Sequence, residues 1–262
     1  MALTWAYRIG GTGTTLTAAQ RDNNILCIYG AMSGHGFSTA AIAGMCGCFY
    51  AESGFNPGIY ETSHGGNLNN LPYFAGGMGL AQWTDYPAYS GTYPNPLPWS
   101  ADKEGRNWYD GNFQCWLLTQ AANSTYTAMG YGQGARWGWQ QSSTYPSISF
   151  DKYKTFSGTP EDACKYWFFC FEWHYYEVPA DYLTLRYKWA RYAYDLIVGK
   201  DPVAPEGGEG GEGGEGGEGG EGGEGDSVIV PGTALTAGQL AYILHARRRR
   251  KNGKQCTFLL RL

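Results

Sequence analysis

A repeat of Glu-Gly-Gly triplets at residues 206–225 is the strongest constraint on how this 262-residue chain can fold. Two of every three residues in the repeat are glycine and none is proline, so it lacks the imino acids of a collagen-like helix. Glycine-rich segments behave as flexible coils, and the seven evenly spaced glutamates repel one another. We therefore expect a folded domain at 1–200, a flexible linker at 201–225 and a short basic tail at 226–262.

The first 200 residues carry mostly helical periodicity. Apolar and small residues recur at helical spacing in four segments: 17–34, 40–53, 112–129 and 160–197. Ser38 and Thr39 are potential N-caps for the second of these helices. Residues 59–109 contain many prolines and are expected to form a long irregular segment. The pattern predicts an all-α domain.

The seven cysteines and four histidines do not form a metal-binding pattern. No two cysteines have the paired C-x2-4-C spacing of a zinc site, and the histidines are dispersed. We expect the cysteines to be buried, reduced thiols that behave as small hydrophobes. The sequence therefore predicts no metal site, and no nucleotide or other cofactor is expected.

Glu52 is the single charged residue in G-M-C-G-C-F-Y-A-E-S-G-F-N-P at 44–57. It falls in the last turn of a predicted helix, where the negative end of the helix dipole and the scarcity of water both disfavour an ionised carboxylate. Cys48 and Phe49, one turn earlier, add apolar surface on the same face. A carboxyl that stays protonated near neutral pH suits a general acid. The alternative is a solvated residue where the helix reaches the surface.

A second informative string, G-G-M-G-L-A-Q-W-T-D, occupies residues 76–85. Glycines such as Gly79 allow a backbone to approach a ligand closely. Gln82 offers both hydrogen-bond donors and an acceptor, and Trp83 offers an aromatic face for stacking on a sugar. Gln82 follows Glu52 by 30 residues, and this spacing makes the pair of motifs more specific than either one.

Together, the E-S-x-x-N-P helix end and the G-x-x-G-L-x-Q loop resemble the lysozyme-like superfamily, which includes goose-type lysozymes and soluble lytic transglycosylases. The chain is more similar still to the phage tail-lysozyme family. That resemblance extends to the G-F-S-T-A-A-I-A-G segment at 36–44, the F-E-W-H-Y-Y-E-V-P segment at 171–179 and the arginine-bearing helix at 186–194. It covers about residues 20–198 and implies an all-α, lysozyme-like fold.

The resemblance also implies an activity and roles for individual residues. The expected reaction is cleavage of the β-1,4 bond between N-acetylmuramic acid and N-acetylglucosamine in bacterial peptidoglycan, with Glu52 protonating the glycosidic oxygen. The residues expected to bind the substrate are Ser53, Gly79, Gln82, Trp83 and Tyr176. The family often has glycine and arginine after Q-W-T, whereas this chain has Asp85-Tyr86-Pro87, and residues 86–108 look like an insertion.

The identity of a second catalytic carboxylate is left open by this departure. An inverting hydrolase needs a base about 6.5 to 9.5 Å from the acid, and a retaining one needs a nucleophile at about 5 to 5.5 Å. A lytic transglycosylase needs neither, because the muramic 6-hydroxyl attacks. Asp85 is the first candidate and Glu61 the second, and each is alternatively a surface or capping residue. Glu177 is expected to be structural. Hydrolysis is slightly favoured for a phage enzyme.

Two rival functions remain open. Gln114-Cys115-Trp116 is similar to the Q-C pair of cysteine-dependent amidohydrolases, with His174 as the base for a Cys115 thiolate. Few strand patterns accompany it, although such enzymes are α+β proteins. The other rival is a catalytically inactive virion or wall-binding protein that keeps the lysozyme-like fold.

The ends of the chain bear on location and partners. The N-terminus lacks a basic segment followed by an apolar run, so no signal peptide is expected, and no stretch reaches the ~20 apolar residues of a membrane span. We expect a protein that is carried in the virion or made in the host cytoplasm and released to the wall. The tail has seven basic residues against Asp226 alone, a charge suited to virion proteins or anionic wall polymers but without a nucleic-acid-binding module.

Removing residues 206–262 is expected to leave cleavage of soluble glycan fragments almost unchanged, because a flexible linker cannot couple the tail rigidly to the active site. The rates of the full chain and the shortened chain on such fragments measure this, and binding to intact walls serves as the parallel assay. Complete loss of fragment cleavage would show that the tail belongs to the catalytic fold.

Overall fold

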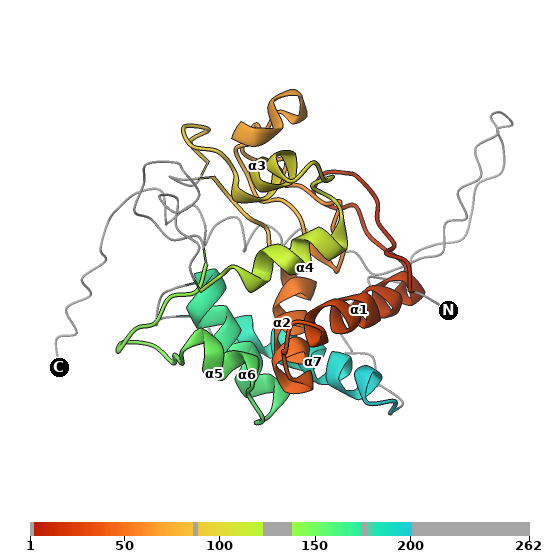
Figure 1. Ribbon diagram of the computed structural model, residues 1–262, viewed down its shortest axis with the longest axis vertical. Coiled ribbons are helices and arrows are strands. Elements are labelled where there is room, and N and C mark those ends of the chain that lie inside the picture. The colour runs from red at the N-terminus through yellow and green to blue at the C-terminus, as the bar shows by residue number, and fades with distance from the viewer. Residues whose placement is uncertain (1–2, 86–88, 123–137, 174–177, 179, 201–262) are drawn as a thin grey trace, which may run out of the picture. The chain divides into compact units, whose positions relative to one another are not determined.

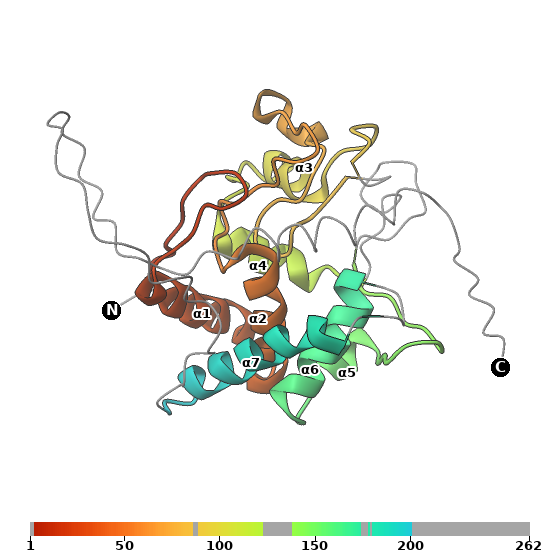
Figure 2. The same ribbon diagram turned by 180° about the vertical axis from the view of Figure 1, so that it is seen from behind.

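Helix α2 (Thr39–Ser53) lies at the centre of the domain, between α1 (Ala18–Ser33) and α4 (Gly111–Thr119) on one side and α6 (Pro160–Trp167) and α7 (Ala180–Ile197) on the other (Figures 1 and 2). All its residues from 40 to 51 are buried. A helix that is apolar all round has to be enclosed by others. The computed structural model describes residues 3–85, 89–122, 138–173, 178 and 180–200.

The first two helices begin where the sequence predicts. Thr17 caps α1 by accepting a hydrogen bond from the Gln20 backbone, and the Gln20 side chain accepts one from the Thr17 backbone in return. Ser38 caps α2 by accepting from the Ala41 amide at 3.1 Å. Helix α2 ends at Gly54, whose φ of 57° is the left-handed conformation that stops a helix just after Glu52.

Two glycines on α2 allow the neighbouring helices to approach closely. A Cβ atom on Gly44 would lie 2.6 Å from the backbone of Ala163 in α6. A Cβ atom on Gly47 would lie 2.3 Å from the carbonyl oxygen of Arg186 in α7 and 2.9 Å from the Cβ of Ala190. Both distances are shorter than real side-chain contacts, so these positions require glycine.

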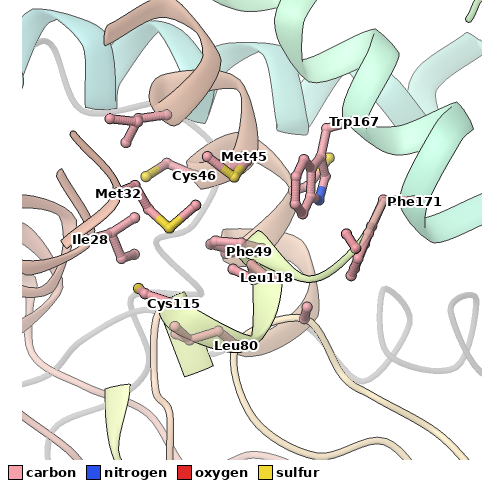
Figure 3. Close-up of a cluster of buried hydrophobic side chains, with 14 of the residues drawn as sticks. Ile28, Met32, Met45, Cys46, Phe49, Leu80, Cys115, Leu118, Trp167 and Phe171 are labelled. Carbon is pink, nitrogen blue, oxygen red and sulfur yellow. The ribbon is translucent and has the colours of Figure 1, made fainter. Parts of the chain in front are cut away.

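The core gathers around Phe49 in the second half of α2. Figure 3 shows Phe49 between Ile28 and Met32 of α1 and the rings of Trp167 and Phe171. Phe49 meets the edge of Trp167 with ring centroids 5.8 Å apart. Cys115 and Leu118 of α4 and Leu80 of the loop that follows α2 close the cluster (Figure 3). The same packing that buries the core therefore fixes the end of α2.

The segment expected to be irregular contains two short helices, which corrects that prediction. They are the 3-10 helix η1 (Leu68–Tyr73) and α3 (Pro96–Lys103). Pro96 stands at the first position of α3, where its missing N–H is not needed, and Asn95 caps that helix. A further short helix, α5 (Phe150–Lys154), precedes α6. Helix α4 ends at Thr119, before the predicted 129, and residues 123–137 lie outside the described ranges.

The predicted helix at 160–197 also differs from the structure. Helix α6 continues into a π-helix, η2 (Phe168–Trp173), and α7 begins separately at Ala180. Among the described residues, β-type pairing is limited to isolated bridges, Gly10 with Ile59, Tyr60 with Met78 and Met78 with Trp83. The predicted all-α, lysozyme-like class is confirmed. No helix in the described part of the chain is long and apolar enough to cross a membrane.

Gly47→Ala is expected to lower the free energy of unfolding by about 1–3 kcal/mol, because the added methyl group pushes α7 away from α2. Gly30→Ala is the matched control. Gly30 lies in α1 with open space where a Cβ atom would stand, so alanine there should stabilise by about 0.5–1 kcal/mol. Urea unfolding of both variants measures the difference, and equal effects at the two positions would contradict the close-approach argument.

Candidate active site

Glu52 and Arg186 form a buried ion pair at the end of α2. Nη2 of Arg186 donates to Oε1 of Glu52 at 2.8 Å. The Arg186 side chain is 3% exposed and the Glu52 side chain is 5% exposed. The guanidinium also lies over the rings of Tyr182 and Phe168, at 4.3 Å and 5.2 Å from their centroids. Because it is stacked and hydrogen-bonded, Arg186 holds the Glu52 carboxyl in one orientation.

A second carboxylate shares the same arginine. Oε2 of Glu172, in η2, lies 3.8 Å from Nε of Arg186, and the Glu172 side chain is 7% exposed. Burial lowers the pKa of Arg186, but Tyr182, Glu172 and Glu52 together raise it above its ordinary value. Arg186 is therefore a permanent cation between two acidic side chains.

The surroundings of Glu52 differ from those predicted. Cys48 is buried as expected, and burial raises the pKa of its thiol well above the ordinary range. No local pattern indicates the arginine, because Arg186 lies 134 residues further along and joins the site only when α7 packs on α2. Besides the apolar surface of Cys48 and Phe49, Glu52 therefore has a buried cation as a neighbour.

The second motif forms a tight turn beside the chain that leaves α2. Met78 and Trp83 exchange two backbone hydrogen bonds of 3.0 Å, and Gly79 N–H donates to the Ile59 carbonyl at 2.8 Å. Gln82 adopts a positive φ of 48°, and its side-chain amide donates to the Gly79 carbonyl at 2.9 Å. The loop at 76–83 therefore runs directly alongside the segment that follows Glu52.

Gln114 of α4 joins the two motifs through one buried side chain. Its Nε2 donates to the carbonyls of Pro57 and Trp108 at 2.8 Å and 2.7 Å, and its Oε1 accepts from Leu80 N–H at 2.8 Å. A Cβ atom on Gly79 would lie 2.6 Å from the Gln114 oxygen, so the glycine makes room for this amide. The two motifs are thus held at a fixed separation.

Three predicted substrate-binding residues are buried in the structure. Trp83 is 3% exposed and belongs to the core, so its ring does not present an open stacking face, contrary to the expected groove wall. The Ser53 hydroxyl donates to the Phe49 carbonyl of its own helix at 2.8 Å. Gln82 is 9% exposed. Tyr176 lies outside the described residues, as does Glu177.

Asp85 organises the turn that follows the second motif. It is 3% exposed, and its carboxylate accepts from the backbone of Tyr89, Ser90 and Gly91 at 2.6 to 2.7 Å and from the Ser90 hydroxyl at 3.2 Å. Burial raises the pKa of Asp85, and these hydrogen bonds partly oppose the shift. Four donors around one carboxylate are typical of a residue that holds a loop.

Glu61, the other candidate for a second carboxylate, is also tied into loop structure. Its Oε1 accepts from the Ser63 hydroxyl at 2.9 Å and lies 3.1 Å from Nδ1 of His64, and its Oε2 accepts from Gly77 N–H at 3.1 Å. The His64 ring stacks on Tyr89 with centroids 3.6 Å apart. Glu61 thus links the extended segment after α2 to the turn that Asp85 holds.

The comparison with known families agrees with this arrangement. The family model described as phage tail lysozyme matches residues 23–197, a span that contains Glu52, the loop at 76–83 and Arg186. The chain belongs to the phage tail lysozyme family. No curated protein matches it. Membership in this family supports a lysozyme-like role in peptidoglycan degradation.

The amidohydrolase hypothesis does not fit this phage tail lysozyme. Cys115 is fully buried in the core, and burial raises the pKa of its thiol far above the ordinary value, whereas a nucleophile needs an accessible thiolate. Its neighbour Gln114 is a structural amide, so the Q-C pair has a packing explanation. His174 lies outside the described residues. Among those described, no cluster of three or more His, Cys, Asp or Glu side chains could hold a metal.

Glu172 and Arg186 are the site residues that sequence reasoning missed. The sequence places Arg186 only on a helix with a basic face, and Glu172 only within an aromatic segment. A buried arginine needs an acidic partner. An arginine where the helical periodicity of α7 calls for an apolar residue is therefore the sequence signal for a buried ion pair. The position of Glu172 carries no such signal, because a π-helix cannot be distinguished from an α-helix by periodicity alone.

Proposed function

We propose that this phage tail lysozyme cleaves the β-1,4 bond between N-acetylmuramic acid and N-acetylglucosamine, with Glu52 as the general acid. One observation carries the proposal: the Glu52 carboxyl is enclosed at the end of α2 and oriented by Arg186 at 2.8 Å. A positioned, shielded carboxyl is suited to protonating a leaving oxygen as the glycosidic bond breaks.

The residues around Glu52 divide the remaining tasks. The proton of Glu52 passes to the glycosidic oxygen. Arg186 then stabilises the carboxylate that remains on Glu52. The loop at 76–83, including Gly79 and Gln82, is proposed to lie along the bound sugar chain, on the strength of the family motif. Tyr176 and Ser53 remain proposed contacts on the strength of the family motif.

The second carboxylate decides whether water or the muramic 6-hydroxyl attacks. We infer that Asp85 holds the turn at 85–91 and is not the base, because the four donors that surround it in the described part of the chain come from that turn. The same argument applies to Glu61 and its loop partners. Glu52 is proposed as the acid in either route.

The family's phage tail origin supports association with the virion and peptidoglycan as the partner. We propose that the linker at 201–225 carries the basic tail at 226–262 to virion proteins or anionic wall polymers. An inactive wall-binding protein would keep the fold without cleaving glycan, and zymography on purified peptidoglycan distinguishes the two.

Glu52→Gln is expected to lower peptidoglycan cleavage by ~10² to 10⁴, because glutamine keeps the shape and can accept from Arg186 but has no proton to transfer. Arg186 retains Glu172 as a counter-ion, so the unfolding temperature should change little. Turbidity loss of wall suspensions measures the rate, and Glu161→Gln is the matched control. Activity of Glu52→Gln within a few-fold of wild type would remove Glu52 from this role.

Asp85→Asn is expected to reduce stability and rate modestly while leaving the chemical products unchanged, because asparagine replaces one acceptor oxygen with a donor. Ser90→Ala removes one of the same hydrogen bonds without touching the carboxylate, and should act in the same direction but less. Mass spectrometry separates reducing ends from 1,6-anhydro ends, which differ by one water. A rate loss of ~10² or more at unchanged stability would instead assign Asp85 as a general base.

A further inference from the structure

Two buried carboxyl groups contact different nitrogens of one buried guanidinium. Arg186 contacts Glu52 through Nη2 at 2.8 Å and Glu172 through Nε at 3.8 Å, and all three side chains are less than a tenth exposed. If both carboxyls were ionised, the group would carry an excess negative charge away from water. Burial of an unbalanced charge is unfavourable, so one proton is favoured within the pair.

We propose that Glu172 is a positioning residue that acts through Arg186 to keep a proton available on Glu52. Without Glu172, the guanidinium would have Glu52 as its sole acidic partner among the described residues and would favour the carboxylate, which cannot act as an acid. With Glu172 present, Arg186 is already balanced and the second carboxyl can keep its proton. This inference rests on the proposed role of Glu52 as general acid.

The remaining described groups around the arginine do not supply the missing charge. They are the thiol of Cys48 and the phenol of Tyr182, which act on Arg186 besides the two carboxyls. Burial raises the pKa of Cys48 well above its ordinary value, and a phenol is ordinarily neutral near pH 7. Glu172 is therefore the described acidic group other than Glu52 that balances Arg186 near neutral pH.

The π-helix explains how Glu172 comes to this position. Helix α6 passes into η2 at Phe168, and the wider turn rotates the residues that follow relative to a continuous α-helix. The Cys170 carbonyl in η2 accepts a hydrogen bond from Gln140 N–H at 2.6 Å, so a loop outside the helix satisfies this group. Short π-helical turns often occur at functional sites.

The pH dependence of kcat/KM on soluble glycan fragments tests the proposal, with Glu172→Gln as the main variant. In this variant the high-pH limb of the profile, where kcat/KM falls as pH rises, should move down by about one pH unit. At the pH where the wild-type limb has fallen to half, kcat/KM of the variant is then about fivefold lower. Glu161→Gln is the matched control. It breaks the exposed Glu161–Arg191 pair between α6 and α7 and should leave the limb where it is. An unmoved limb in Glu172→Gln would overturn the proposal.

Two further variants separate charge from packing. Glu172→Asp keeps the charge, so its limb should stay near that of wild type, and a downward shift like that of Glu172→Gln would contradict a charge effect. The double variant Glu172→Gln/Arg186→Met removes both charges, and its limb should lie at or above the wild-type position even if the rate falls. If Glu172→Gln does not fold, this double variant decides, and a limb below wild type overturns the proposal.

The outcomes also distinguish this inference from the proposed function. An active Glu52→Gln enzyme would remove the general acid itself, whatever Glu172 does. An inactive Glu52→Gln enzyme together with an unmoved limb in Glu172→Gln would leave the general acid in place and remove only the role of Glu172.

Discussion

The close approach of α7 to α2 at Gly47 is the constraint on which the site depends. The Arg186 carbonyl occupies the space that a side chain at position 47 would fill, so the guanidinium of the same residue can reach Glu52. Gly44 plays the corresponding part for α6, which continues into η2 and brings Glu172 to the arginine. Small residues in one central helix thus determine where three charged side chains of three elements meet.

Burying these charges adds little net stability to a domain of this kind, since desolvation of an ion pair commonly offsets its Coulomb attraction. Removal of Arg186 alone would leave two buried acidic side chains without their shared cation and would be much more damaging. The group therefore specifies a unique arrangement of α2, η2 and α7 more than it strengthens the fold. Its stacking on Tyr182 and Phe168 adds directional contacts that a lysine could not reproduce.

Sequence reasoning can predict the parts of this structure that depend on local patterns. Thr17 and Ser38 mark the starts of α1 and α2, and the position of Glu52 in the last turn follows from the same pattern. It cannot predict the Arg186 contact, which depends on the packing of two helices far apart in the chain. Pro96 begins α3, a helix that the sequence does not reveal. Proline interrupts helices but also favours their first position, so its presence alone does not distinguish a loop from a helix start. The motif around Trp83 suggests an exposed ring beside a ligand, whereas that ring fills the core.

Irregular backbone near a buried site requires its own hydrogen-bond partners, and here enclosed amide side chains supply many of them. Asn56 bonds both backbone groups of Arg8, and Asn95 donates to the carbonyls of Gly76 and Trp83. Gln114 does the same for the segments after Glu52 and before Gln82. Since buried peptide groups must be paired, an amide with both donors and an acceptor can replace a missing strand partner. The loop that carries the second motif is therefore held by hydrogen bonds from Asn95 and from Gln114 of α4, and a site built on loops needs such support if its acid is to meet a sugar at a fixed position.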